Sequence, residues 1–149
     1  MEYILVFFLS YLFGSVPFGL ILTKLFNKKD IRKIGSGNIG ATNVLRTGNK
    51  MLAVSTLILD VLKGYIPVLV TQIYCIELTY LSALIVFLAH IFPVWLKFKG
   101  GKGVATYLGI LFALSLPLSI LFIFTWIIVL QIFKYSSVSS MFSSFTVLT

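Results

Sequence analysis

The residues best suited to chemistry lie in a stretch of glycines and small polar residues that ends in an arginine. The stretch runs from Gly35 to Arg46 and reads GSGNIGATNVLR. Glycines at this spacing let a backbone approach a ligand and present successive N–H groups to an anion. Arginine can hold a phosphate through two parallel hydrogen bonds. The same composition is typical of an ordinary turn, so the pattern alone leaves a plain loop equally open.

A second glycine-rich stretch, KFKGGKG at positions 97–103, directly precedes an apolar run. Glycines around a lysine at a helix start suit phosphate, because free N–H groups and the positive end of the helix dipole point the same way. The stretch is not a Walker A loop, which needs glycine where Leu96 stands and Ser or Thr where Gly103 stands. It therefore predicts phosphate binding but no nucleotide.

Other polar residues interrupt or border the apolar runs. Asp60 and Lys63 lie three positions apart in one run, and we interpret them as an internal ion pair, with contact to a substrate as the alternative. His90 is the only histidine, and a hydrogen-bonded structural role is favoured over base catalysis. Ser137 belongs to a hydroxyl-rich stretch after Lys134, where helix capping is the simpler interpretation.

The elements that must position these residues are membrane helices. Hydrophobic residues make up 59% of the chain and charged residues 11%, with a mean hydropathy of +1.07, whereas a soluble domain carries roughly 25% charged residues. The apolar runs are about 17 to 25 residues long, which indicates helices rather than barrel strands. The single cysteine, Cys75, excludes an internal disulfide and a cysteine-based metal site.

The net charge of +8 is unevenly distributed along the chain. Eleven of the 12 lysines and arginines fall in three segments, at 24–50, 97–102 and 134, and the first of these segments includes Lys28. By the positive-inside rule these segments are cytoplasmic, while Glu2 and Glu77 are external. The N-terminus is therefore expected to be external.

We predict an all-α, polytopic transmembrane helix bundle that forms a single domain over residues 1–149. The predicted spans are 3–23, 51–73, 80–96, 104–115 and 118–133, followed by a partial sixth span from Met141 to the chain end at Thr149. One kinked helix over 104–133 would place Lys134 outside, so two helices separated near Leu116 and Pro117 are preferred.

Five motifs in order resemble the bacterial PlsY family. They are GSVPFG from Gly14, DIRKIGSGNIGATNVLR from Asp30, LDVLKG from Leu59, HIFP from His90 and FKGGKGVAT from Phe98. Members of this family are membrane glycerol-3-phosphate acyltransferases that use acyl phosphate. The resemblance implies acyl transfer to the 1-hydroxyl of glycerol 3-phosphate, forming lysophosphatidic acid and phosphate in phospholipid biosynthesis.

The resemblance also implies an environment and a set of partners. The expected location is the bacterial cell inner membrane, with the active loops cytoplasmic. The expected partners are acyl phosphate, glycerol 3-phosphate and membrane lipid, without nucleic acid, cofactor or metal. Few carboxylates lie near the loops, so we expect the phosphate of the donor, rather than a side chain, to accept the proton.

Site residues are carried over motif by motif. Catalytic roles are expected for Ser36, Arg46 and Lys102. Substrate binding is expected for positions that match the two loop motifs, His90 and a serine near the site: Gly37, Asn38, Gly40, Thr42, Asn43, His90, Gly100, Gly101, Gly103 and Ser137.

One departure from the family concerns its C-terminal part. Family members continue into a further cytoplasmic motif with His, Asn and Glu, which does not occur before Thr149. We therefore expect a C-terminally truncated member with little or no activity of its own. A small anion transporter or channel subunit is the alternative from another class, with thinner support because no inverted repeat is visible.

Overall fold

The computed structural model describes residues 1–27 and 29–148, so Lys28 and Thr149 lie outside the described residues. Within these ranges the chain forms α-helices and short 3-10 helices and no strand. The α-helices are α1 Glu2–Ser15, α2 Phe18–Asn27, α3 Ala41–Leu45, α4 Lys50–Tyr74, α5 Thr79–Ile91, α6 Val104–Leu114, α7 Leu116–Phe133 and α8 Ser136–Leu148; the 3-10 helices are η1 Ile31–Lys33, η2 Ile76–Leu78 and η3 Val94–Leu96. The predicted all-α fold is confirmed.

Four segments are long and apolar enough to cross a membrane: Glu2–Asn27, Lys50–Tyr74, Ile76–Leu96 and Leu116–Phe133. A fifth apolar helix, Val104–Leu114, is shorter. Many large apolar side chains on these segments face outward, which suits contact with lipid. Five spans with an external N-terminus and a single domain stay predictions.

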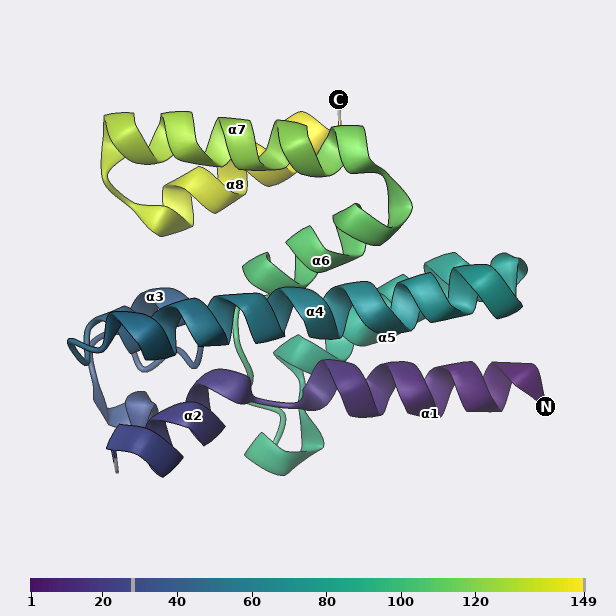
Figure 1. Cartoon of the computed structure of the whole chain (residues 1–149), viewed down its shortest axis with the longest axis horizontal. Coiled ribbons are helices and arrows are strands. Elements are labelled where there is room, and N and C mark those ends of the chain that lie inside the picture. The colour runs from purple at the N-terminus through teal and green to yellow at the C-terminus, as the bar shows by residue number, and fades with distance from the viewer. Residues whose placement is uncertain (28, 149) are drawn as a thin grey trace.

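The first predicted span, 3–23, lies within the candidate membrane segment Glu2–Asn27, but it is not one continuous helix. The chain breaks between α1 and α2 at Val16 and Pro17, where Val16 is extended with φ −64° and ψ 117°. Proline has no N–H to donate and disfavours helical backbone at the residue before it. Two helices of different direction therefore replace a single rod (Figure 1).

The predicted break between the fourth and fifth spans is confirmed. Ser115 is extended, with φ −161° and ψ 110°, and Pro117 lies in the first turn of α7, where a missing N–H costs nothing. The last helix, α8, starts at Ser136 and therefore earlier than the predicted start near Met141. It returns alongside α7 (Figure 1).

Helix α4 lies in the middle of the bundle and packs against α1, α5 and α6 (Figure 1). The contact with α6 depends on glycine. A Cβ at Gly64 would overlap the carbonyl oxygen of Thr106, and a Cβ at Gly109 would overlap that of Val61. Small residues let membrane helices approach backbone to backbone. This contact fixes the start of α6, and thus the end of the second glycine-rich stretch, against the middle of α4.

Candidate active site

The first loop, residues 30–46, is organised around the side chain of Asn43. Its Nδ2 donates to the carbonyl oxygens of Ile31 at 3.1 Å, Ile34 at 2.9 Å and Asn38 at 2.8 Å. Its Oδ1 accepts the Ser36 N–H at 3.1 Å. Asn43 is buried, and both ends of its amide are used by the loop itself. The structure thus gives Asn43 a loop-ordering role beside the substrate contact expected from the sequence.

Two glycines of this loop adopt backbone conformations that favour glycine. Gly35 has φ +56° and Gly37 has φ +71°. A Cβ at Gly35 would lie 2.7 Å from Arg46 Nη1, so the guanidinium passes directly over the glycine turn. Ser36 and Arg46 are both exposed. The turn therefore presents a hydroxyl and a guanidinium together at the surface.

The only acid of the first loop does not neutralise Arg46. Asp30 forms an ion pair of 2.6 Å with Arg32 and caps η1 by accepting the Arg32 N–H. The hydrogen bonds from Arg32 hold the pKa of Asp30 well below its usual range. Among residues 1–27 and 29–148, Arg46 forms no ion pair. Its positive charge is left for an anionic ligand.

The second loop folds back onto the end of α5. The Gly100 N–H donates to the carbonyl oxygen of Ile91 at 2.9 Å, and the Gly101 N–H donates to that of His90 at 3.2 Å. His90 is buried, and its Nδ1 lies 3.1 Å from the hydroxyl of Thr106. A Cβ at Gly101 would overlap His90 Nε2. His90 is thus hydrogen-bonded beneath the loop, and its expected contact with substrate stays a prediction.

Lys102 and Gly103 complete the second loop. Lys102 is exposed. Gly103, with φ +78°, precedes α6 and packs against the Phe87 ring. The first N–H groups of a helix have no intrahelical partner and favour an anion. An exposed lysine beside such a helix start is a suitable place for a phosphoryl group.

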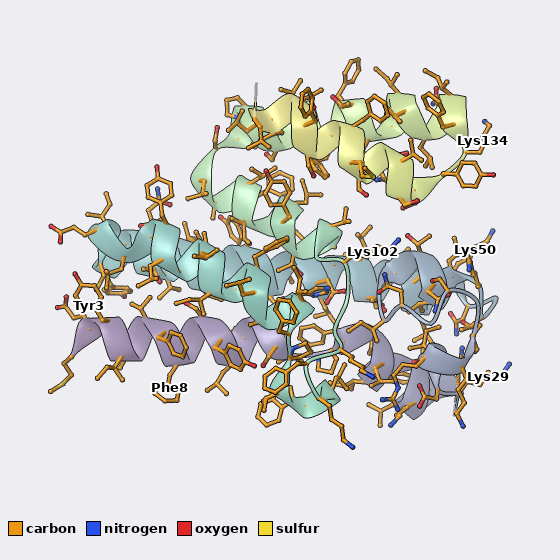
Figure 2. All side chains as sticks on the ribbon, turned by 180° about the vertical axis from the view of Figure 1, so that it is seen from behind. Tyr3, Phe8, Lys29, Lys50, Lys102 and Lys134 are labelled. Carbon is orange, nitrogen blue, oxygen red and sulfur yellow. The ribbon has the colours of Figure 1, made fainter. Side chains whose placement is uncertain are left out.

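The basic residues gather toward one end of the molecule. Figure 2 shows Lys29, Lys50 and Lys134 at the end opposite Tyr3, with Lys102 between that end and the middle. The first loop also meets the start of α8, where the Thr42 hydroxyl lies 3.4 Å from that of Ser136 (distance between oxygens).

The expected residues thus fall into two groups. The first loop contains Ser36, Gly37, Asn38, Gly40, Thr42, Asn43 and Arg46. The second loop contains Gly100, Gly101, Lys102 and Gly103, with His90 below it. Ser137 lies in the first turn of α8, and it is its neighbour Ser136 that contacts the first loop, at Thr42. Within the described part of the chain, no hydrogen bond or ion pair joins Lys102 to the first loop. Sequence reasoning gave no role to Thr106, although it is the last residue of the FKGGKGVAT motif; its contact with His90 appears only in the folded chain. In the described ranges no three His, Cys, Asp or Glu side chains come together as a metal site requires.

The chain is similar along most of its length to known glycerol-3-phosphate acyltransferases. A family model described as glycerol-3-phosphate acyltransferase matches residues 4–149. A glycerol-3-phosphate acyltransferase from Pelagibacter ubique is 56% identical over 147 residues, which cover 99% of this chain and 77% of the relative. One from Bartonella henselae is 54% identical over 142 residues, covering 92% of this chain and 67% of the relative.

Solved structures show the same fold. The crystal structure of PlsY (YgiH), an integral membrane glycerol 3-phosphate acyltransferase, in its glycerol 3-phosphate form has a TM-score of 0.93 and 36% identity, covering 99% of this chain and 74% of that chain. Its lysophosphatidic acid form has a TM-score of 0.90 and 35% identity, with the same coverage. The chain described here therefore belongs to the PlsY family of glycerol-3-phosphate acyltransferases and is an integral membrane enzyme.

Proposed function

We propose that this enzyme transfers a fatty acyl group from acyl phosphate to the 1-hydroxyl of glycerol 3-phosphate. The hydroxyl oxygen bonds to the acyl carbon, the bond from that carbon to the phosphate oxygen breaks, and inorganic phosphate leaves. The observation that carries the proposal is the pair of ordered loops that suit phosphate. Each presents an exposed cation, Arg46 or Lys102, that forms no ion pair within residues 1–27 and 29–148. Both substrates are anionic, and the products are lysophosphatidic acid and phosphate.

The two loops divide the substrates between them in this proposal. The first loop holds the phosphate of glycerol 3-phosphate through Arg46, with Ser36 and the N–H groups of the glycine turn as further donors. The second loop holds the phosphoryl group of the donor through Lys102 and the start of α6. An acyl phosphate is already an activated anhydride, so the protein mainly supplies proximity and charge stabilisation.

The placement of the acids supports proton transfer to the donor rather than to a side chain. The sequence holds only 4 aspartates and glutamates. Asp30 is paired with Arg32, and Asp60 is buried against Lys63. Glu2 is the first residue of α1, and Glu77 lies within η2, which joins α4 to α5. Both elements lie at the end of the bundle away from the basic loops (Figure 1). The departing phosphate is then the nearest base for the hydroxyl proton.

The basic end of the bundle also supports the proposed orientation. Lysines at this end (Figure 2) suit the cytoplasmic side of a bacterial inner membrane, where anionic lipid head groups attract them. Both substrates are then met from the cytoplasm.

The donor can be tested directly in lipid nanodiscs on purified chain fused to the C-terminal motif of its family. Labelled glycerol 3-phosphate is offered with acyl phosphate, acyl-CoA or acyl carrier protein, and lysophosphatidic acid and free phosphate are both measured. We expect product with acyl phosphate alone and one phosphate released per product formed. An Arg46→Ala preparation purified in parallel controls for host enzymes. Equal turnover with acyl-CoA would contradict the proposed donor.

A further inference from the structure

A buried ion pair in the middle of α4 lies outside both loops. Asp60 and Lys63 are each 3% exposed, and their Oδ1 and Nζ atoms lie 2.6 Å apart. Apart from this ion pair, Asp60 Oδ1 has no hydrogen-bond partner among the described residues. Charges at membrane depth are costly, and they are usually paired, functional or both. The predicted internal pair is confirmed, and its surroundings indicate what it does.

Lys63 reaches from α4 to the break between α1 and α2. Its Nζ donates to the carbonyl oxygen of Val16 at 2.7 Å and lies 5.6 Å from the centre of the Phe18 ring. The same carbonyl accepts the N–H of Phe18, the first residue of α2, at 3.1 Å. Lys63 therefore binds the carbonyl group at the point from which α2 departs.

Helix α2 links the break at Val16 to the first loop. Gly19, in the first turn of α2, packs directly against Ile39, because a Cβ at Gly19 would overlap the Ile39 carbonyl oxygen. Ile39 is buried in one cluster with Leu20 and Ile31. The first loop is therefore seated on the first turn of α2, and the direction of α2 depends on the break that Lys63 holds.

The residue after Lys63, Gly64, packs against the residues that support the second loop. Gly64 packs against the Thr106 backbone in α6. The Thr106 hydroxyl contacts His90 Nδ1 at 3.1 Å, and the His90 carbonyl accepts the Gly101 N–H. Lys63 and Gly64, which are adjacent in α4, thus contact the segments against which the first and the second loop pack.

We propose that Asp60 and Lys63 are positioning residues that set the placement of the first loop relative to the second. This inference rests on the proposed function, in which each loop holds one substrate. Because both side chains are buried, they act through Val16 and the helix packing rather than on substrate. Each loop can bind its own phosphate without the pair, but transfer requires the acceptor hydroxyl and the acyl carbon to meet within fractions of an ångström.

The proposal is tested in nanodiscs with Lys63→Met and with the double variant Asp60→Asn/Lys63→Met, both made in the same fused protein, whose unsubstituted form is the wild type. The single variant should lose thermal stability, because a buried carboxylate is left unpaired. The double variant removes both charges and should recover a melting temperature close to that of the wild type. Its kcat should stay at least about tenfold lower, with both KM values within about threefold of the wild type. Thr71→Val, which removes a buried hydroxyl bonded to Pro67 in the same helix, should leave kcat unchanged.

Two outcomes would overturn the positioning role. A stable double variant with wild-type kcat would limit the pair to stability, and a rise in one KM alone would make Lys63 a substrate contact. Spin labels at Lys33→Cys and Lys99→Cys, in a Cys75→Ser background, report the distance between the loops without turnover. We expect a shifted or broadened distance distribution in the double variant, and an unchanged one would refute the inference. Absence of transfer from acyl phosphate in the wild type would instead refute the proposed function.

Discussion

The contact between Gly101 and His90 gives the sharpest test of how the second loop is held. In Gly101→Ala the added Cβ would overlap His90 Nε2. The imidazole is buried and bonded to Thr106, so it can move only by giving up that hydrogen bond or by displacing the loop. Forcing one extra methyl group into a packed site typically costs about 1 to 3 kcal/mol.

The loop displacement should also impair use of the donor. Lys102 follows Gly101 directly, so a shifted loop moves the proposed phosphate contact with it. We expect Gly101→Ala to lower the free energy of unfolding by about 2 kcal/mol and to raise the KM for acyl phosphate. Unfolding in mixed micelles and steady-state kinetics in nanodiscs measure the two effects. Gly40→Ala is the stability control, because a Cβ there meets only Asn38 Oδ1, at 3.8 Å.

A double-mutant cycle with His90→Ala isolates the clash. Removing the imidazole opens the space that the new methyl group needs, so Gly101→Ala should destabilise the His90→Ala protein by about 1 kcal/mol less than the wild type. If the two substitutions are additive, the imidazole is not what requires glycine at this position. The sequence-based explanation, in which Gly101 leaves room for a phosphate, would then be favoured.

Three further predictions concern the charges, the first loop and the topology. Lys102→Ala should raise the KM for acyl phosphate about 10- to 100-fold, since a charged hydrogen bond contributes about 1.5 to 3 kcal/mol, whereas Lys33→Ala should change it little in the same assay. Asn43→Ala removes the hydrogen bonds that order the first loop, so amide hydrogen exchange there should quicken and glycerol 3-phosphate should bind more weakly; unchanged exchange would contradict this. Gly48→Cys in a Cys75→Ser background should resist an impermeant reagent in intact cells and react in inverted vesicles, and labelling from outside would refute the orientation.

The lengths of the hydrophobic runs and the positions of the basic residues predicted most of the helices. Apolar runs located α4 and α7 to within a few residues, because lipid exposure demands long, unbroken apolar stretches. The break at Val16 and Pro17 was not predicted, although Pro17 was a visible signal. A proline early in a membrane helix can be absorbed by neighbours. Whether it ends the helix depends on a partner such as Lys63, which lies far away in sequence.

The sequence predicted which residues make up the site but not the role of each one. The sequence located both loops through glycines, small polar residues and cations at spacings that suit an anion, although the same composition is also typical of a turn. It could not separate residues that face a ligand from those that hold the loop. Asn43 and His90 were expected to bind substrate, and the structure engages both with the protein itself. Such roles depend on which carbonyl or hydroxyl lies within reach, and that is a property of the folded chain.

Hydrogen bonds between uncharged groups order both loops around their cations, and this bears on how the loops bind substrate. Neutral hydrogen bonds to Asn43 shape the first loop, and backbone contacts with His90 shape the second. The ion pair of the first loop joins Asp30 to Arg32 and does not include Arg46. Because the hydrogen bonds around Arg46 and Lys102 come from uncharged groups, an anionic substrate displaces no carboxylate there, and it meets a site already arranged for it.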